Sequence, residues 1–178
     1  MTNAERLLAA VDERLNGRVE LTLYGRAALH LGFLNPPKDY ALSRDVDAVL
    51  WIGQAEELIE HTNFWEVIEE VNVMFADQEL YISHFFEESQ VILTQEWRSK
   101  RVPVKGPWKN LDLFRLGNED LFLSKLMRDD PIDRMDAQFI IDSGQFTQAQ
   151  IRNVIQCARI PPVPEIVEQF ERCSRRFM

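Results

Sequence analysis

Apolar positions change their spacing from one segment of the chain to the next, and this spacing predicts the order of elements. In the first two thirds, spacings typical of strands alternate with spacings typical of amphipathic helices. The predicted elements are a helix from Thr2 to about Gly17, a strand at 19–24, a short helix at 26–31, a strand at 46–52, one or two helices within 54–75, and strands at 80–86 and 91–93. Pro36 and Pro37 predict a loop before the second strand.

The last third of the chain carries helical patterns alone. Capping residues or helix-starting prolines predict four helices, which begin after Asn118, at Asp130-Pro131, at Thr147 and at Pro164. We therefore expect an α+β fold, with a small mixed sheet and flanking helices within residues 1–110. Residues 111–178 are expected to form a C-terminal helical subdomain that packs with this core as one compact unit.

Composition and charge narrow the range of functions. The chain has 178 residues, 46% of them hydrophobic, and a net charge of −9, so generic DNA binding through overall charge is not expected. Residues 45–97 hold thirteen acidic and no basic side chains, whereas residues 98–178 are mildly basic. A long apolar run and a signal-peptide pattern are both missing, so we expect no membrane association and a cytoplasmic location.

Candidate chemistry gathers around the first two predicted strands. Asp45 and Asp47 stand two residues apart on a strand, so their carboxylates point to one face and can share divalent cations. Gly25 lies between a strand and a helix, where backbone amides can approach an anion such as a triphosphate. Together these residues describe a site for a metal and a nucleotide.

This order of parts resembles the nucleotidyltransferase superfamily with the polymerase-β-type fold, in which an apolar strand and a glycine turn precede a strand bearing Asp-x-Asp. More particularly, the chain looks like small bacterial nucleotidyltransferase-like proteins of unknown substrate, related to the abortive-infection, type IV toxin enzymes. Gly25, Asp45 and Asp47 match the first motif. Residues 119–128 and 133–136 are similar to the helical motif that follows the sheet in those relatives.

The resemblance implies Mg²⁺-dependent transfer of a nucleotide from a nucleoside triphosphate to an acceptor hydroxyl, with release of pyrophosphate. The acceptor could be RNA, a protein or a small molecule, and a toxin-like member would have a cognate antitoxin-like partner. Asp45 and Asp47 would hold two Mg²⁺ ions, and Lys125 would contact the triphosphate. Arg26 and Arg44 are further candidates for phosphate contacts.

Several positions leave alternatives open. Arg26 stands where the family has a second glycine or a serine, and it could either hold phosphate or block the turn. A third carboxylate is not evident: Glu79 is the nearest acid, and Ser83 and His84 are accessory candidates, although an isolated histidine is more often structural. A catalytically degenerate nucleotidyltransferase-fold module for binding or regulation is the alternative function.

Structural roles also compete with functional ones in the basic second half of the chain. Lys125 could be an ordinary helix lysine, and for Asp133 and Asp136 we favour a structural role over a catalytic one. The basic stretch 98–109, flanked by Trp97 and Trp108, could contact an RNA acceptor or form a solvated loop.

Overall fold

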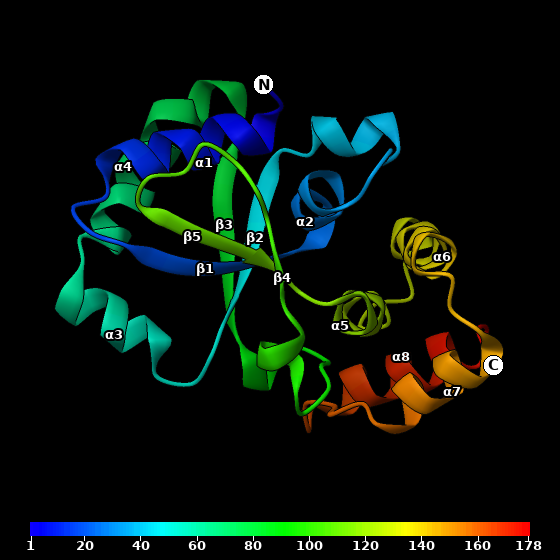
Figure 1. The fold of residues 1–178 in the computed structure, drawn as a ribbon. Coiled ribbons are helices and arrows are strands. Elements are labelled where there is room, and N and C mark those ends of the chain that lie inside the picture. The colour runs from blue at the N-terminus through cyan, green and yellow to red at the C-terminus, as the bar shows by residue number, and fades with distance from the viewer. The chain divides into compact units, whose positions relative to one another are not determined.

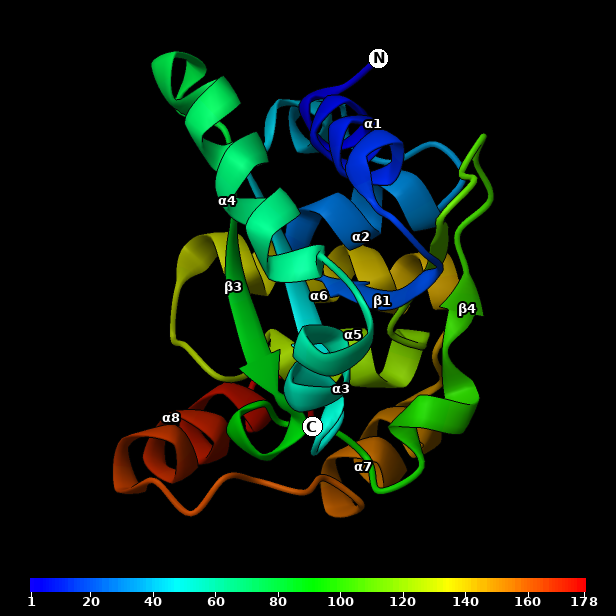
Figure 2. The ribbon, with the colours of Figure 1, turned by 90° about the vertical axis from the view of Figure 1, so that its left-hand side faces the viewer.

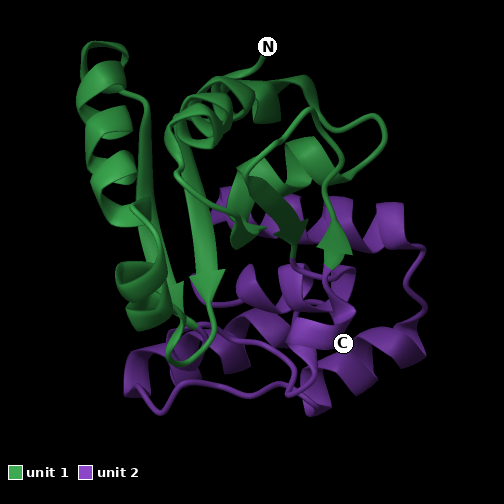
Figure 3. Ribbon diagram, turned by 60° about the vertical axis from the view of Figure 1, so that its left-hand side comes forward, with its two compact units in different colours: residues 1–87, 102–115 green, residues 88–101, 116–178 purple.

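The computed structural model describes all 178 residues and confirms the α+β class (Figure 1). The chain forms two compact units, each made of two segments (Figure 3). Residues 1–87 and 102–115 make unit 1, and residues 88–101 and 116–178 make unit 2. This division differs from the expected boundary at residue 110, because the chain passes into unit 2 at residue 88 and returns to unit 1 at residue 102 before leaving it again.

Unit 1 holds a five-stranded mixed sheet with the order β3-β2-β1-β5-β4. Its strands are β1 (Val19–Tyr24), β2 (Asp45–Leu50), β3 (Tyr81–Glu87), β4 (Val102–Pro103) and β5 (Leu111–Arg115). β2 runs antiparallel to β1, and β4 runs antiparallel to β5, while the pairs β1–β5 and β2–β3 are parallel. β5 has no counterpart among the elements predicted from the sequence, and it lies beside β1 in the sheet.

One face of the sheet is apolar. Alternate residues of β2 and their neighbours on β1 and β3 are buried on this face: Leu21, Leu23, Val46, Ala48, Leu50 and Ile82. Phe85 belongs to the same face, and the rings of Phe64 and Trp65 pack edge-on against it. These two aromatic residues begin α4, so α4 covers the apolar face, and Figure 2 shows it running alongside β3. Asp45 and Asp47 project from the opposite face.

The helices of unit 1 are α1 (Asn3–Arg14), α2 (Gly25–Gly32), α3 (Gln54–His61) and α4 (Phe64–Phe75). The predicted Thr2–Glu5 capping box is present at the start of α1. A left-handed Gly53 precedes α3, and the chain between α3 and α4 breaks the predicted 54–75 segment into two helices. The predicted proline loop leads into a short 3₁₀ helix at Lys38–Leu42.

β3 lies at the edge of the sheet, and a side chain of α4 binds part of its open side. The Ile82 N–H donates to Asn72 Oδ1 at 2.7 Å, and Asn72 Nδ2 donates to the Ile82 carbonyl at 2.9 Å. The Asn72 amide therefore pairs with both backbone groups of one edge residue, as a neighbouring strand would.

Unit 2 contains α5 (Asn118–Ser124), α6 (Pro131–Gly144), α7 (Gln148–Gln156) and α8 (Pro164–Ser174). The predicted caps of α6 and α7 are confirmed: Asp130 accepts from the Ile132 N–H at 2.7 Å, and Thr147 forms a capping box with Gln150. α5 is shorter than predicted and follows Gly117 directly, so Asn118 is its first residue and not its cap.

The segment 88–101 belongs to unit 2 but does not form the predicted strand at 91–93. Ile92 and Leu93 are fully buried, and only Leu93 makes an isolated bridge, to Arg159. A short apolar run indicates burial without specifying a strand, because pairing also requires a neighbour with free backbone groups. Trp97 is also buried and donates from Nε1 to Glu88 at 2.8 Å, so it is not exposed for stacking on a base.

None of the helices combines the length and the apolar run that crossing a bilayer requires.

Candidate metal centre

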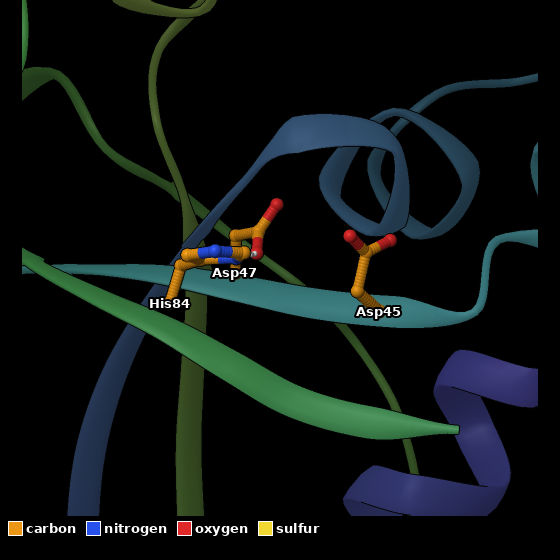
Figure 4. Close-up of side chains that lie close together, drawn as sticks. All are labelled: Asp45, Asp47 and His84. Carbon is orange, nitrogen blue, oxygen red and sulfur yellow. Dashed lines mark hydrogen bonds and ion pairs between the residues drawn. The ribbon is translucent and has the colours of Figure 1, made fainter. Parts of the chain in front are cut away.

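Three potential metal ligands come together on adjacent strands of unit 1 (Figure 4). Asp45 and Asp47 point to the same side of β2, and the ring of His84 on β3 lies beside Asp47. One ligand atom from each of the three residues lies within 4.8 Å of the others. The two carboxylates were expected to share a face, whereas the histidine had been only an accessory candidate.

A bulge in β3 brings His84 to this position. Val46 is paired with Ile82, but the next residue, Asp47, is paired with His84, so Ser83 is an extra residue in β3. In regular pairing Ser83 would stand beside Asp47, and His84 would point to the apolar face. The irregularity therefore moves an imidazole into the acidic site.

Hydrogen bonds orient all three side chains. His84 Nδ1 lies 2.9 Å from Asp47 Oδ1, and Ser83 Oγ lies 2.9 Å from the same ring nitrogen. The Ser43 hydroxyl donates to Asp45 Oδ1 at 3.0 Å. Because Ser83 and Asp47 contact one and the same nitrogen, the arrangement is not a nucleophilic triad, in which serine and aspartate bind opposite ring nitrogens.

Gly25 brings the backbone at the start of α2 against Asp47. Its φ is +73°, and a Cβ added there would lie 2.8 Å from Asp47 Oδ2. Tyr24, at the N-cap position, makes no side-chain capping bond to the first turn of α2. The first turn of a helix carries partial positive charge on its free N–H groups, which favours a nearby carboxylate or phosphate.

The two candidate phosphate-binding arginines have acidic partners. Arg26 pairs with Asp39 at 3.3 Å, and its guanidinium lies 4.9 Å from the ring centre of Tyr40. Both partners belong to the 3₁₀ helix that follows the prolines, so the segment between α2 and β2 supplies contacts for Arg26. Arg44 forms an exposed ion pair with Glu79.

Glu79, which the sequence offered as the nearest acid for a third carboxylate, is not part of the group of potential metal ligands. It occupies a left-handed turn before β3, where φ is +54°, and its side chain reaches Arg44. His84 takes the third position. An open surface depression beside the group is lined by Arg44, Asp45, Glu79, Tyr81 and Ser83.

The second segment that carries the family resemblance forms a buried ion-pair cluster within unit 2. Lys125 Nζ lies 3.2 Å from Asp133 Oδ1 and 2.8 Å from Asp136 Oδ2. The Lys125 side chain is only 8% exposed, and Arg128 adds a 2.8 Å contact to Asp133. The charge of Lys125 is thus balanced by two carboxylates of α6.

Comparisons with protein-family models, with curated proteins and with solved structures find no significant match for this chain.

Proposed function

We propose that the protein is a divalent-metal-dependent nucleotidyltransferase that transfers a nucleotide from a nucleoside triphosphate to an acceptor hydroxyl. The observation that carries the proposal is the position of Asp47, whose carboxylate lies against the Gly25 backbone at the first turn of α2. A cation held by Asp45 and Asp47 would lie beside backbone N–H groups suited to phosphate oxygens. The metal site and the phosphate site would then be adjacent, as nucleotide transfer requires.

The chemistry of the donor group fits a divalent cation. Two carboxylates and an imidazole supply three ligands from neighbouring strands, and their proximity suits one ion. A cation bound there would supply positive charge to the phosphate oxygens during transfer. A second ion, which the family resemblance implies, would take its remaining ligands from nucleotide phosphates and water.

The protein's own residues position the substrate in this proposal. Because Gly25 has no side chain, the Asp47 carboxylate can lie against the first turn of α2, and Ser43 holds Asp45 in its orientation. Arg44 borders the depression beside Asp45 and can exchange its exposed partner Glu79 for a phosphate. The labelling experiment described below identifies the class of acceptor.

The proposal is tested by calorimetric titration of each of the four nucleoside triphosphates into the protein, with and without Mg²⁺. We expect Mg²⁺-dependent binding of at least one nucleotide and its loss in the variant Asp45→Asn/Asp47→Asn, because removing two direct ligands costs more than the roughly tenfold to 100-fold lost with a residue that only supports a ligand. The matched control is Glu56→Gln/Glu57→Gln, which removes the same charge from the surface of α3. Unchanged affinity in a folded Asp45→Asn/Asp47→Asn variant would contradict the site.

A degenerate binding module is the second candidate, and it is favoured by the histidine in place of a third carboxylate. It predicts metal-dependent nucleotide binding without transfer. Incubation with triphosphates labelled at the α-phosphate, in the presence of RNA, protein extract and small-molecule pools, separates the two functions. Label in any acceptor that depends on Asp45 and Asp47 supports the enzyme.

A further inference from the structure

We propose that His84 is a direct metal ligand and that it makes the site selective for first-row transition-metal ions, with Mn²⁺ preferred to Mg²⁺. The inference rests on the proposed function in that it concerns the same metal group. It goes further because the family resemblance alone implies an all-oxygen Mg²⁺ site. The argument depends on the position of the imidazole, on its chemistry and on how firmly it is held.

The position of the ring suits a shared ion. His84 Nδ1 and Asp47 Oδ1 lie 2.9 Å apart and are joined by a hydrogen bond. Two adjacent ligands of a six-coordinate ion with bonds of about 2.1 Å are separated by about 3 Å. An ion bound to both atoms would take the place of the proton in this hydrogen bond, and the distance between the two atoms already suits it.

The chemistry of the three ligand atoms favours Mn²⁺ over Mg²⁺. Mg²⁺ binds oxygen ligands and gains little from an imidazole, whereas imidazole nitrogen suits transition-metal ions. Mn²⁺ accepts carboxylates as well as nitrogen, so it can use all three donors of this group. Mg²⁺ would use the two carboxylates and leave the third position to water.

The ring is held in place before any ion binds. It stacks on Phe86 with centroids 5.6 Å apart and an angle of 4° between the planes, and Phe86 in turn contacts Tyr24 edge-on. The bulge at Ser83 fixes the register of β3 beside Asp47. With half of its side chain exposed, His84 is accessible to an ion from solvent. A preoriented ligand loses less entropy on binding.

The test measures Mn²⁺ binding by the loss of the paramagnetic resonance signal of the free ion, with Mg²⁺ as competitor and without nucleotide. We expect the wild-type protein to bind Mn²⁺ more tightly than Mg²⁺, because only Mn²⁺ gains from the imidazole ligand. His84→Asn keeps a hydrogen-bond donor for Asp47 but removes the imidazole ligand. It should weaken Mn²⁺ binding by about tenfold or more and change Mg²⁺ binding far less.

Two further variants sharpen the result. His84→Asp makes the group all-oxygen and should raise the affinity for Mg²⁺ relative to Mn²⁺. His61→Asn, at an exposed histidine of α3, is the matched control and should leave both affinities unchanged. Equal affinities for the two ions in the wild type, or Mn²⁺ binding that survives His84→Asn, would overturn the role of His84. Those outcomes leave the proposed function standing, since loss of Mg²⁺-dependent nucleotide binding in Asp45→Asn/Asp47→Asn tests that separately.

Discussion

At Gly25 the backbone turns from β1 into α2 with a φ of +73°, and Asp47 fills the space that a side chain would need. Gly53, before α3, also has a positive φ of +90°, but no atom lies within 4 Å of the place where its Cβ would be. The two glycines therefore share a backbone conformation and differ in their surroundings. This difference separates the need for a left-handed backbone, which both glycines meet, from the need for space beside Asp47, which only Gly25 meets.

We predict that Gly53→Ala lowers the free energy of unfolding by about 1–2 kcal/mol, the cost of a left-handed conformation for an L-residue. Gly25→Ala should lose a further amount of about 1–3 kcal/mol, because Asp47 must move away from the added methyl group. Only Gly25→Ala should also weaken metal binding. Denaturant unfolding and Mn²⁺ titration of both variants check this, and equal losses of stability in the two would contradict the close approach.

Between elements, the cluster of Lys125, Asp133 and Asp136 connects the end of α5 to α6. All three side chains are nearly excluded from solvent, with exposed fractions of 8%, 5% and 0%. Buried charges are tolerated only when they are paired, and removal of one partner leaves the others without compensation. The cluster therefore joins the end of α5 to α6 within unit 2 through contacts between buried charges.

Lys125→Met should accordingly lower the free energy of unfolding by about 3–5 kcal/mol, because two buried carboxylates lose their contact with the Lys125 ammonium group. Adding Asp133→Asn and Asp136→Asn to this variant should recover part of the loss. Lys105→Met, at an exposed lysine, is the control and should have little effect. Thermal unfolding checks the order of stabilities. A Lys125→Met variant as stable as the wild-type protein would contradict the structural role. Weakened nucleotide binding in the folded variant would instead assign Lys125 the triphosphate contact that the family resemblance implies.

At the scale of the whole molecule, the loss of stability in acid depends on carboxylates that accept hydrogen bonds from backbone N–H groups. Asp12 of α1 accepts hydrogen bonds of 2.8–3.0 Å from the N–H groups of Lys109, Asn110 and Leu111 at the start of β5. Burial of Asp12 raises its pKa, but these hydrogen bonds and the charge of Lys109 outweigh it and hold the pKa below the ordinary value of 3.8. The charged form therefore stabilises the folded state.

The stabilisation by Asp12 is complete above pH 3.8 and is lost as the pH falls through the lower pKa of the folded state. We expect Asp12→Asn to lower the free energy of unfolding by about 1.5–3 kcal/mol at neutral pH, which is typical of hydrogen bonds to a charged group. The difference from wild type should shrink below pH 3.8. Denaturant unfolding between pH 7 and pH 2 measures it, with the exposed Glu13→Gln as control. A difference that is independent of pH would refute this account.

Local sequence patterns predicted the elements that carry their own start and stop residues. α1, α6 and α7 begin at the caps that the sequence indicates, because a capping bond joins residues only two or three positions apart. β5 was missed, since it is five residues long and takes its place from parallel pairing with β1, about ninety positions earlier. A strand of this kind has little local signal.

The candidate site was also predictable only as far as local sequence patterns reach. Asp45, Asp47 and Gly25 were recognisable because the two acids alternate on one strand and the glycine lies between a strand and a helix. His84 was not assigned to the group of potential metal ligands, because its position depends on the bulge at Ser83 and on the pairing of β3 with β2. Glu79 was only the nearest acid in the sequence, and its side chain pairs with Arg44. Register between strands is a tertiary property and cannot be derived from either strand alone.

The contact between Asn72 and Ile82 affects how copies of this protein meet one another. An exposed edge strand offers a row of unpaired backbone groups on which a strand of another molecule can add. On β3 the Asn72 amide already satisfies the N–H and the carbonyl of Ile82, and the bulge at Ser83 interrupts the regular spacing directly after it. A foreign strand would have to displace the amide and match an irregular backbone. The helix that covers the apolar face of the sheet thus also protects its edge from intermolecular β-sheet growth.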